Sequence, residues 1–181
     1  GQAPLVAKGK IIMSGNQPSG FIQAFDVETG KHLWTWNAIP QSATDPGAET
    51  WAEGSWKLGG GPIWVSGSFD PELNTIFYGT GQPGSQWAGE VREGDNLFTE
   101  CIVALDVDTG KMKWYFQPTP HDVRDYDFQL TPIVWNQLVI GGGKAGVVIA
   151  WNRETHRRVW DFTRDGVRRI TGSLQGSTID G

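Results

Sequence analysis

Cysteine is almost absent from this chain of 181 residues, since Cys101 carries the one thiol that it contains. A lone cysteine excludes an internal disulfide, so the cysteine content leaves the redox compartment open. Cys101 begins the apolar run "CIVALDV", and no residue near it in sequence would lower the pKa of a thiol. We therefore expect it to be buried as a small hydrophobic side chain.

Charge and long apolar runs are also scarce. Charged residues make up 19% of the chain and the formal net charge is -5, which argues against nucleic acid as a partner because phosphate contacts need a concentrated excess of Lys and Arg. The hydrophobic content of 38% suffices for one soluble domain, but no run is continuous enough for a membrane span. The opening residues "GQAPLVAKGK" lack the pattern of a signal peptide. Helical periodicity is nearly absent, which favours an all-β fold.

Abundant glycine and tryptophan, 25 and 10 residues, accompany a repeated pattern of strand, polar turn and second strand ending on tryptophan. The three copies are "AFDVETGKHLW" (24–34), "ALDVDTGKMKW" (104–114) and "AWNRETHRRVW" (150–160). Thr-Gly in the first two turns supplies a residue that adopts positive φ, and His156 replaces that glycine in the third. Such recurrence is typical of β-propeller blades, with the repeated tryptophans packed between blades: Trp34, Trp114 and Trp160.

The chain is too short for a large closed propeller. Propellers close with about 4–8 blades, whereas this chain carries three copies of the repeat. We therefore expect residues 1–181 to form a single partial β-propeller domain, about three to four blades of a longer chain.

Three long polar connections, at 37–61, 82–100 and 118–130, exceed what a minimal blade needs and are the expected place for a site. The third contains "TPHDVRDYDF", in which Asp125 and Asp127 would point the same way if the segment were extended. Two adjacent carboxylates repel unless a cation lies between them, and a hard ion with oxygen ligands would fill that role. The alternative is that these aspartates cap turns and pair with Arg124.

Several segments together resemble the quinoprotein alcohol and methanol dehydrogenases, which depend on pyrroloquinoline quinone (PQQ) and have eight-bladed propellers. They are the tryptophan repeat, "GGGPIWVSGSFDPELNTIFYGTGQPG" (59–84), "REGDNLFTECIVALDVDTGKMKW" (92–114) and "TPHDVRDYD" (119–127). The similarity runs over most of residues 9–160. It implies an enzyme that oxidises an alcohol by hydride transfer to PQQ with a metal ion assisting.

The resemblance implies which residues bind the quinone. Family members stack its flat ring on a tryptophan in the segment matching "GGGPIW", which is Trp64; ordinary core packing is the alternative for this side chain. A basic residue that hydrogen-bonds the quinone oxygens matches Lys144 in "GGGKAG", with a plain surface lysine as the alternative. The segment "SGNQ" falls where the family lines the cofactor, which would place three more residues near the quinone: Ser14, Gly15 and Asn16.

The resemblance also implies calcium or a lanthanide ion beside the quinone. Asp125 matches the aspartate that binds the metal and takes the alcohol proton, and Asp127 matches a position that is acidic in the lanthanide-using branch. Two other metal ligands of the family match amides here, since Gln17 replaces a glutamate and Gln82 an asparagine. Arg124 replaces an aromatic residue and adds a cation. These departures predict weaker affinity for a trivalent ion.

Two functions therefore remain open on the sequence. The first is a PQQ-dependent alcohol dehydrogenase, with a small alcohol as substrate, a cytochrome as electron acceptor and a periplasmic location, all implied by the family. The second is a non-catalytic propeller, either a degenerate quinoprotein or a scaffold that binds other proteins. The chain lacks an adjacent cysteine pair and a Cys-x-x-Cys-His haem site, so its haem content and electron acceptor stay undetermined.

Overall fold

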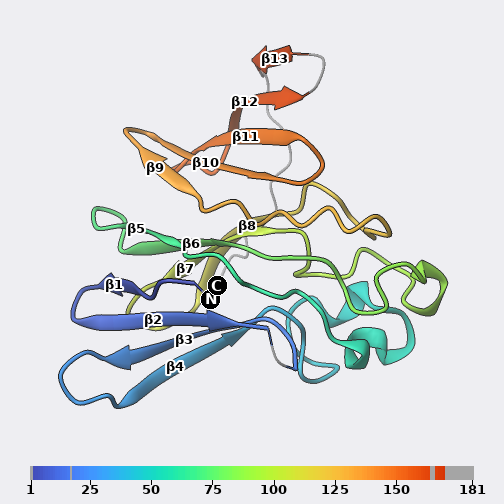
Figure 1. Ribbon diagram of the computed structural model, residues 1–181, viewed down its shortest axis with the longest axis horizontal. Coiled ribbons are helices and arrows are strands. Elements are labelled where there is room, and N and C mark those ends of the chain that lie inside the picture. Colours follow the sequence, from blue (N-terminus) through green and yellow to red (C-terminus); the bar gives the residue numbers. More distant parts are fainter. Residues whose placement is uncertain (1, 17, 164–165, 170–181) are drawn as a thin grey trace.

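Three antiparallel sheets lie one above the other in the computed structural model, which describes residues 2–16, 18–163 and, for the backbone, 166–169 (Figure 1). The first sheet contains β1 (Leu5–Ala7), β2 (Lys10–Gly15), β3 (Phe21–Asp26) and β4 (His32–Asn37). The second contains β5 (Ser68–Asp70), β6 (Thr75–Gly79), β7 (Ile102–Asp106) and β8 (Met112–Phe116). The third contains β9 (Ile133–Trp135), β10 (Leu138–Gly143), β11 (Val147–Asn152), β12 (Arg158–Thr163) and β13 (Gly166–Arg169).

The order of strands within and between the sheets is that of propeller blades. Each sheet is a meander in which sequential strands pair, and the first strands contact one another from sheet to sheet, β1 with β5 and β5 with β9. First strands side by side are the arrangement expected around a propeller axis. The all-β class and the blade architecture predicted from the repeat are confirmed.

The third blade departs from the expected four strands. Its fourth strand, β12, pairs on its outer side with β13, and Trp160 is the register partner of Arg169. Trp160 has no further blade beside it in the part of the chain that the structure describes, so its predicted docking stays a prediction. No helix among the described residues is long and apolar enough to cross a membrane.

The hairpin turns of the three repeats share one hydrogen-bond pattern. Asp26 and Asp106 each accept, at Oδ1, the backbone N–H groups two and three residues later, and Asn152 does the same with its amide oxygen. The N–H of Gly30, Gly110 or His156 then closes the turn on the carbonyl of that first residue. Local Asx chemistry therefore fixes each turn, which explains why the turns were readable from the sequence.

Tryptophans from one blade dock on the turn of the next blade. Trp34 donates its indole N–H to the carbonyl of Val107 at 3.1 Å, and a Cβ at Gly110 would lie 2.5 Å from the Trp34 ring. In the third blade His156 takes the place of this glycine at φ 61°, and its ring stacks on Trp114 with centroids 5.1 Å apart. His156 therefore keeps the turn geometry of a glycine and adds a ring contact between blades.

The middle sheet is buried on both faces because the side chains of β6 alternate in direction. Ile76 and Tyr78 belong to the hydrophobic core shared with the first sheet, whereas Phe77 belongs to the core shared with the third. Cys101 is fully buried in the first of these cores, as predicted. Both cores hold the blades in a fixed relation, which in turn fixes the connections that leave the strands.

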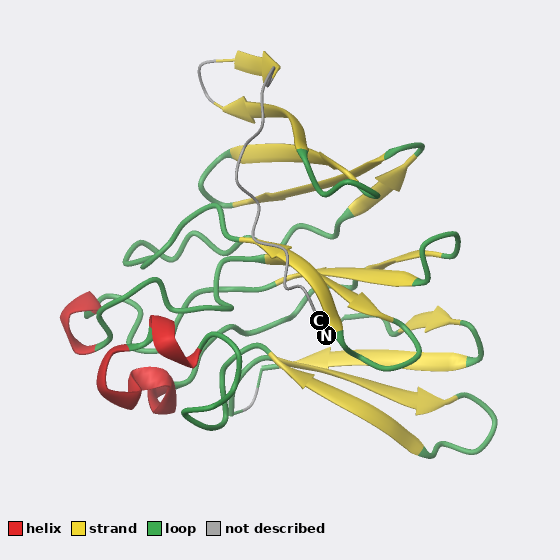
Figure 2. Cartoon of the chain, turned by 180° about the vertical axis from the view of Figure 1, so that it is seen from behind, coloured by secondary structure: helices red, strands yellow, loops and turns green. Residues whose placement is uncertain are grey.

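The long connections gather at one end of the stacked sheets and carry the three 3₁₀ helices (Figure 2). These helices are η1 (Ala48–Thr50), η2 (Ala52–Leu58) and η3 (Gly89–Val91). The apolar residues before β5 do not form a strand, since β5 begins only at Ser68. Three glycines at positive φ precede it, which keeps this stretch irregular: Gly59, Gly60 and Gly61.

Candidate quinone and cation site

Trp64 lies in the irregular segment before β5 and presents its indole to the surface. Its backbone N–H donates to Oε1 of Gln129 at 3.1 Å, and Nε2 of the same glutamine donates to the carbonyl of Pro62 at 2.6 Å. Gln129 thus clamps the backbone on both sides of Ile63. Trp64 is 39% exposed, so it is not enclosed by the cores of the described residues.

The exposed indole borders an open groove of about 350 Å³. Ser14, Gly15 and Asn16, at the end of β2, lie at the same groove, so the structure brings together four residues that the family resemblance assigned to the quinone. A Cβ at Gly15 would lie 2.5 Å from the ring of Phe21, so a larger residue there would have to displace that ring. Gln17, the fourth residue of the segment 14–17 with a predicted role, lies outside the described residues.

Lys144 connects this groove to the aspartates of the third connection. Its ammonium lies 5.7 Å from the centre of the Trp64 ring, 3.1 Å from Oδ2 of Asp125, and in contact with Oδ2 of Asp127. The pKa of Lys144 is raised, first by its hydrogen bond to Asp127. One ammonium thus contacts an aromatic face and two carboxylates, while the Lys144 side chain stays 51% exposed.

Asp125 and Asp127 do lie together, but not for the reason expected from the sequence. Both residues have left-handed backbone, with φ of 61° and 40°, so the segment is not extended. Their carboxylates converge because both reach Lys144. Within the described part of the chain Arg124 forms no ion pair with either carboxylate; its guanidinium donates to the Tyr126 hydroxyl at 3.3 Å.

Asp122, the first aspartate of this connection, caps a turn. Its Oδ1 accepts the N–H of Arg124 at 2.9 Å and its Oδ2 accepts the N–H of Tyr126 at 3.0 Å. Its carbonyl accepts a hydrogen bond from the buried guanidinium of Arg92 at 2.5 Å. Asp122 therefore shapes the backbone that presents Asp125.

Asp125 and Asp127 occupy different environments. The side chain of Asp125 is 32% exposed, whereas that of Asp127 is 1% exposed. Oδ1 of Asp127 accepts the N–H of Gln82 at 3.0 Å and lies so close to Gly81 that a Cβ there would be 2.5 Å away. Burial raises the pKa of Asp127, and the contacts with Lys144 and Gln82 act in the opposite direction.

Glu100 lies behind Asp127 and was missed in the sequence analysis. Its Oε1 accepts the backbone N–H of Asp127 at 2.9 Å, and the residue is almost fully buried. Burial, followed by the charges of Asp122 and Asp127, raises the pKa of Glu100 to about 9. The signal in the sequence was an isolated acid two residues before the buried strand that begins at Ile102.

Arg92 is a second residue that the sequence analysis did not single out. It is fully buried and donates to the carbonyls of Gly84 and Gln86 at 3.0 and 2.9 Å, and to Oδ1 of Asn96 at 2.7 Å. Together with its bond to the Asp122 carbonyl, these contacts join the connection at 80–101 to the connection at 117–132. Burial lowers the pKa of Arg92, and its four acceptors compensate for the buried charge.

Two carboxylates and one amide of this region have oxygen atoms of the type that binds a hard cation. Asp125 and Asp127 supply carboxylates, and Oε1 of Gln82 is buried without a hydrogen-bond partner among the described residues. Carboxylate and amide oxygens are the ligands that calcium prefers. Among residues 2–16 and 18–163 there is no group of three or more His, Cys, Asp or Glu side chains that could hold a metal, so a cation here would depend on the amide of Gln82.

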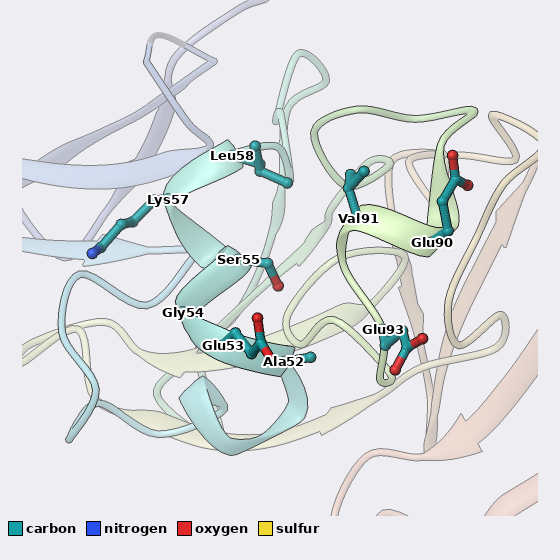
Figure 3. A pocket seen from close by; sticks show the side chains of 9 residues that line it. All are labelled: Ala52, Glu53, Gly54, Ser55, Lys57, Leu58, Glu90, Val91 and Glu93. Atoms are coloured by element: carbon teal, nitrogen blue, oxygen red, sulfur yellow. The ribbon is translucent and has the colours of Figure 1, made fainter.

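A separate cavity of about 510 Å³ lies between η2 and η3 (Figure 3). Figure 3 shows Glu53, Glu90 and Glu93 around it. None of the residues predicted from the sequence lines this cavity.

Comparison with known proteins matches residues 2–167 to the PQQ family described as "Glucose/ethanol/alcohol dehydrogenase, beta-propeller domain". The chain belongs to this family, the PQQ-dependent alcohol dehydrogenases. It is 41% identical over 165 residues to the quinohemoprotein alcohol dehydrogenase of Comamonas testosteroni, with 81% of this chain and 23% of the relative covered. It is 33% identical over 193 residues to the lanthanide-dependent methanol dehydrogenase of Methylacidiphilum fumariolicum strain SolV, with 95% of this chain and 30% of the relative covered.

Solved structures of the family have the same fold. A europium-containing methanol dehydrogenase superimposes with a TM-score of 0.81 at 28% identity, covering 90% of this chain and 33% of that one. The quinohemoprotein alcohol dehydrogenase of Comamonas testosteroni superimposes with a TM-score of 0.75 at 34% identity, covering 99% of this chain and 30% of that one. The chain thus spans less than a third of the length of these two curated relatives. The predicted family and propeller fold are confirmed.

Proposed function

We propose that the protein containing this chain oxidises an alcohol by hydride transfer to PQQ, with a bound cation assisting. The observation that carries the proposal is the position of Lys144, whose ammonium lies 5.7 Å from the Trp64 ring centre and contacts both Asp125 and Asp127. Bound PQQ supplies the acceptor for the hydride that leaves the alcohol carbon. The residues of this chain bind the quinone and the cation, orient the alcohol and remove its hydroxyl proton.

The groove beside Trp64 is proposed as the quinone site. The indole provides a flat apolar floor for a flat conjugated ring, and its 39% exposure leaves one surface available for stacking. Ser14, Gly15 and Asn16 line the side of the groove. Lys144 stands above the indole, where its ammonium can donate to a quinone oxygen and stabilise negative charge that develops there.

Asp125 is proposed as the base. Its carboxylate is half-buried, so a substrate hydroxyl can reach it, and its 3.1 Å contact with Lys144 places it near the proposed quinone site. Proton removal by a positioned carboxylate assists departure of a hydride from the adjacent carbon. Asp125 therefore holds the proton that the alcohol loses.

Asp127, Gln82 and Asp125 are proposed as the cation ligands of this chain. Asp127 is buried and held by Gln82 and Lys144, which suits a fixed ligand better than a group that exchanges protons with substrate. Calcium or a lanthanide bound there would supply positive charge next to the quinone oxygens. Gln17 is kept as a further proposed ligand, although it lies outside the described residues.

A non-catalytic propeller is the second candidate, and one observation favours it. The positive charge between Asp125 and Asp127 is supplied by Lys144 itself, so the chain can neutralise these carboxylates without a metal. A protein that kept the blades and lost the cation would retain this arrangement. The two candidates therefore differ in whether the acids bind a metal ion.

We also propose the wider setting that the family implies. The chain would form part of one eight-bladed propeller domain, act on a small alcohol, pass electrons to a cytochrome and work in the periplasm. One relative is named as the dehydrogenase subunit of an alcohol dehydrogenase (quinone) from Gluconobacter oxydans, which supports a separate electron acceptor.

The test uses the full-length protein, incubated with PQQ and with calcium or lanthanum. Alcohol-dependent reduction of an artificial electron acceptor, which requires both PQQ and the metal, is the expected result. PQQ binding without turnover under either metal would favour the non-catalytic propeller. Absence of PQQ binding by equilibrium dialysis would reject the quinone site.

A further inference from the structure

We propose that Glu100 is a positioning residue, whose carboxyl group fixes the backbone of Asp127 and thereby directs the Asp127 carboxylate toward Lys144 and the proposed cation. The proposal deepens the proposed function and rests on it for the role of Asp127. Its structural part, the fixing of the Asp127 backbone, can be tested without a metal or a quinone.

The contact between Glu100 and Asp127 is a buried hydrogen bond of ordinary length. Oε1 of Glu100 accepts the N–H of Asp127 at 2.9 Å, and Glu100 is 1% exposed. The N–H of Glu100 in turn donates to the carbonyl of Gly81 at 3.0 Å. Glu100 therefore joins the backbone of Asp127 to the residue before Gln82, whose own N–H binds the Asp127 carboxylate.

The backbone of Asp127 needs such support. Its φ of 40° is an uncommon conformation for a residue with a side chain, and a segment in this conformation persists only where its surroundings hold it. Lys144 N–H donates to the carbonyls of Tyr126 and Asp127 at 2.8 and 3.3 Å, which fixes the segment from the other side. Without Glu100, the buried N–H of Asp127 would lose its acceptor.

The conformation and the burial of Glu100 both reduce the stability of the fold, and the residues next to it in sequence do not account for them. Its backbone is left-handed, with φ of 56°, and its side chain is polar and buried. Its neighbours use their polar groups elsewhere, since Thr99 Oγ1 donates to the Asn96 carbonyl and Cys101 N–H donates to Thr80 Oγ1. The Glu100 carboxyl is the group in this stretch that turns toward Asp127.

Two substitutions of Glu100 distinguish a role in positioning Asp127 from a general contribution to stability. Glu100→Gln keeps an oxygen that can accept the Asp127 N–H, whereas Glu100→Met fills a similar volume without an acceptor. Glu90→Met, in the separate cavity at η3, is the matched control for loss of a glutamate. All are made in the full-length protein.

Hydrogen–deuterium exchange of the peptide containing Asp127, followed by mass spectrometry, is the first measurement. Glu100→Met is expected to accelerate exchange in this peptide, and Glu100→Gln and Glu90→Met are expected to match the wild type. Wild-type exchange in Glu100→Met would overturn the proposal. If Glu100→Met does not fold, Glu100→Gln provides the test. Glu100→Gln retains an acceptor for the Asp127 N–H, so accelerated exchange of the Asp127 peptide in this variant would also overturn the proposal.

Terbium binding, measured by tryptophan-sensitised luminescence, is the second measurement. We expect Glu100→Met to weaken terbium affinity about tenfold, as loss of a partner behind a metal ligand commonly does, with Glu100→Gln restoring it. Unchanged affinity in Glu100→Met would reject the positioning role toward the cation. Absence of terbium binding by the wild type would instead reject the metal part of the proposed function, and the exchange data would then decide the Glu100 proposal by themselves.

Discussion

The ammonium of Lys144 lies 5.7 Å from the centre of the Trp64 indole ring, although the two residues belong to different blades. Lys144 follows β10 in the third sheet and Trp64 precedes β5 in the second. The same ammonium contacts Asp125 and Asp127, so one side chain joins the proposed quinone floor to the proposed base. The site therefore depends on how the blades stack.

Replacing Trp64 should weaken quinone binding without unfolding the protein. Stacking on an aromatic ring contributes about 1 kcal/mol beyond the area that it buries, so we expect Trp64→Ala to lower PQQ affinity roughly tenfold and Trp64→Phe to lower it less. Equilibrium dialysis of the full-length protein gives the affinities. Trp87→Ala is the control, because Trp87 is 66% exposed and lies outside the groove. Equal affinities for Trp64→Ala and Trp87→Ala would contradict the proposed stacking.

Neutralising Asp125 should stop the chemistry and leave quinone binding intact. Loss of a general base commonly reduces turnover by about 10² to 10⁴-fold, and we expect Asp125→Asn to fall in this range for kcat. PQQ affinity should stay within about threefold of the wild type, since the proposed quinone contacts are made by other residues. Asp95→Asn, at an exposed position of the neighbouring connection, is the control. Near-normal turnover in Asp125→Asn would rule out its role as the base.

His156 should make stability depend on pH. Burial, and to a lesser extent Lys113, lowers the pKa of His156 below its ordinary value of 6.5. A histidine with a lowered pKa in the folded state stabilises the fold fully above the unfolded pKa, and this contribution is lost as the pH falls below about 6.5. His156→Asn can adopt the same positive φ but does not titrate. Its melting temperature should therefore fall less than that of the wild type between pH 8 and pH 5.5; parallel declines would contradict this.

The ion pair of Arg153 should matter far more for stability than that of Lys8. Arg153 is 7% exposed and binds Asp70, which is fully buried, at 2.5 Å between the second and third blades. Removing one partner of a buried pair commonly costs about 3–5 kcal/mol, and we expect Arg153→Met to destabilise the protein in this range.

The matched variant is Lys8→Met, which removes an exposed contact with Asp108 between the first and second blades. Lys8 is 46% exposed and Lys10 still binds Asp108 at 2.7 Å, so the expected loss is below about 1 kcal/mol. Urea denaturation measures the free energy of unfolding of both variants. Similar losses for the two variants would show that burial of the Arg153 pair does not control its contribution.

Much of the fold was readable from the sequence because it depends on local patterns. The Asx turns at Asp26, Asp106 and Asn152 use groups within a few residues of one another. The tryptophans after the first two turns, Trp34 and Trp114, pack on the turn of the following blade. The irregular segment around Trp64 was harder to predict, because its apolar residues have a pattern that is typical of a strand. Glycines at positive φ and the side chain of Gln129, far along the chain, prevent that strand from forming.

The sequence alone determined the blades, the turns and a set of acids and aromatic residues in the long connections, since turn chemistry and strand alternation act between near neighbours. Only the tertiary structure decided that Lys144 contacts both Asp125 and Asp127, that Arg124 binds the Tyr126 hydroxyl, and that Glu100 binds the backbone of Asp127. These contacts join connections from different blades and different hairpins. Their geometry follows from the packing of the two hydrophobic cores, which no local pattern encodes.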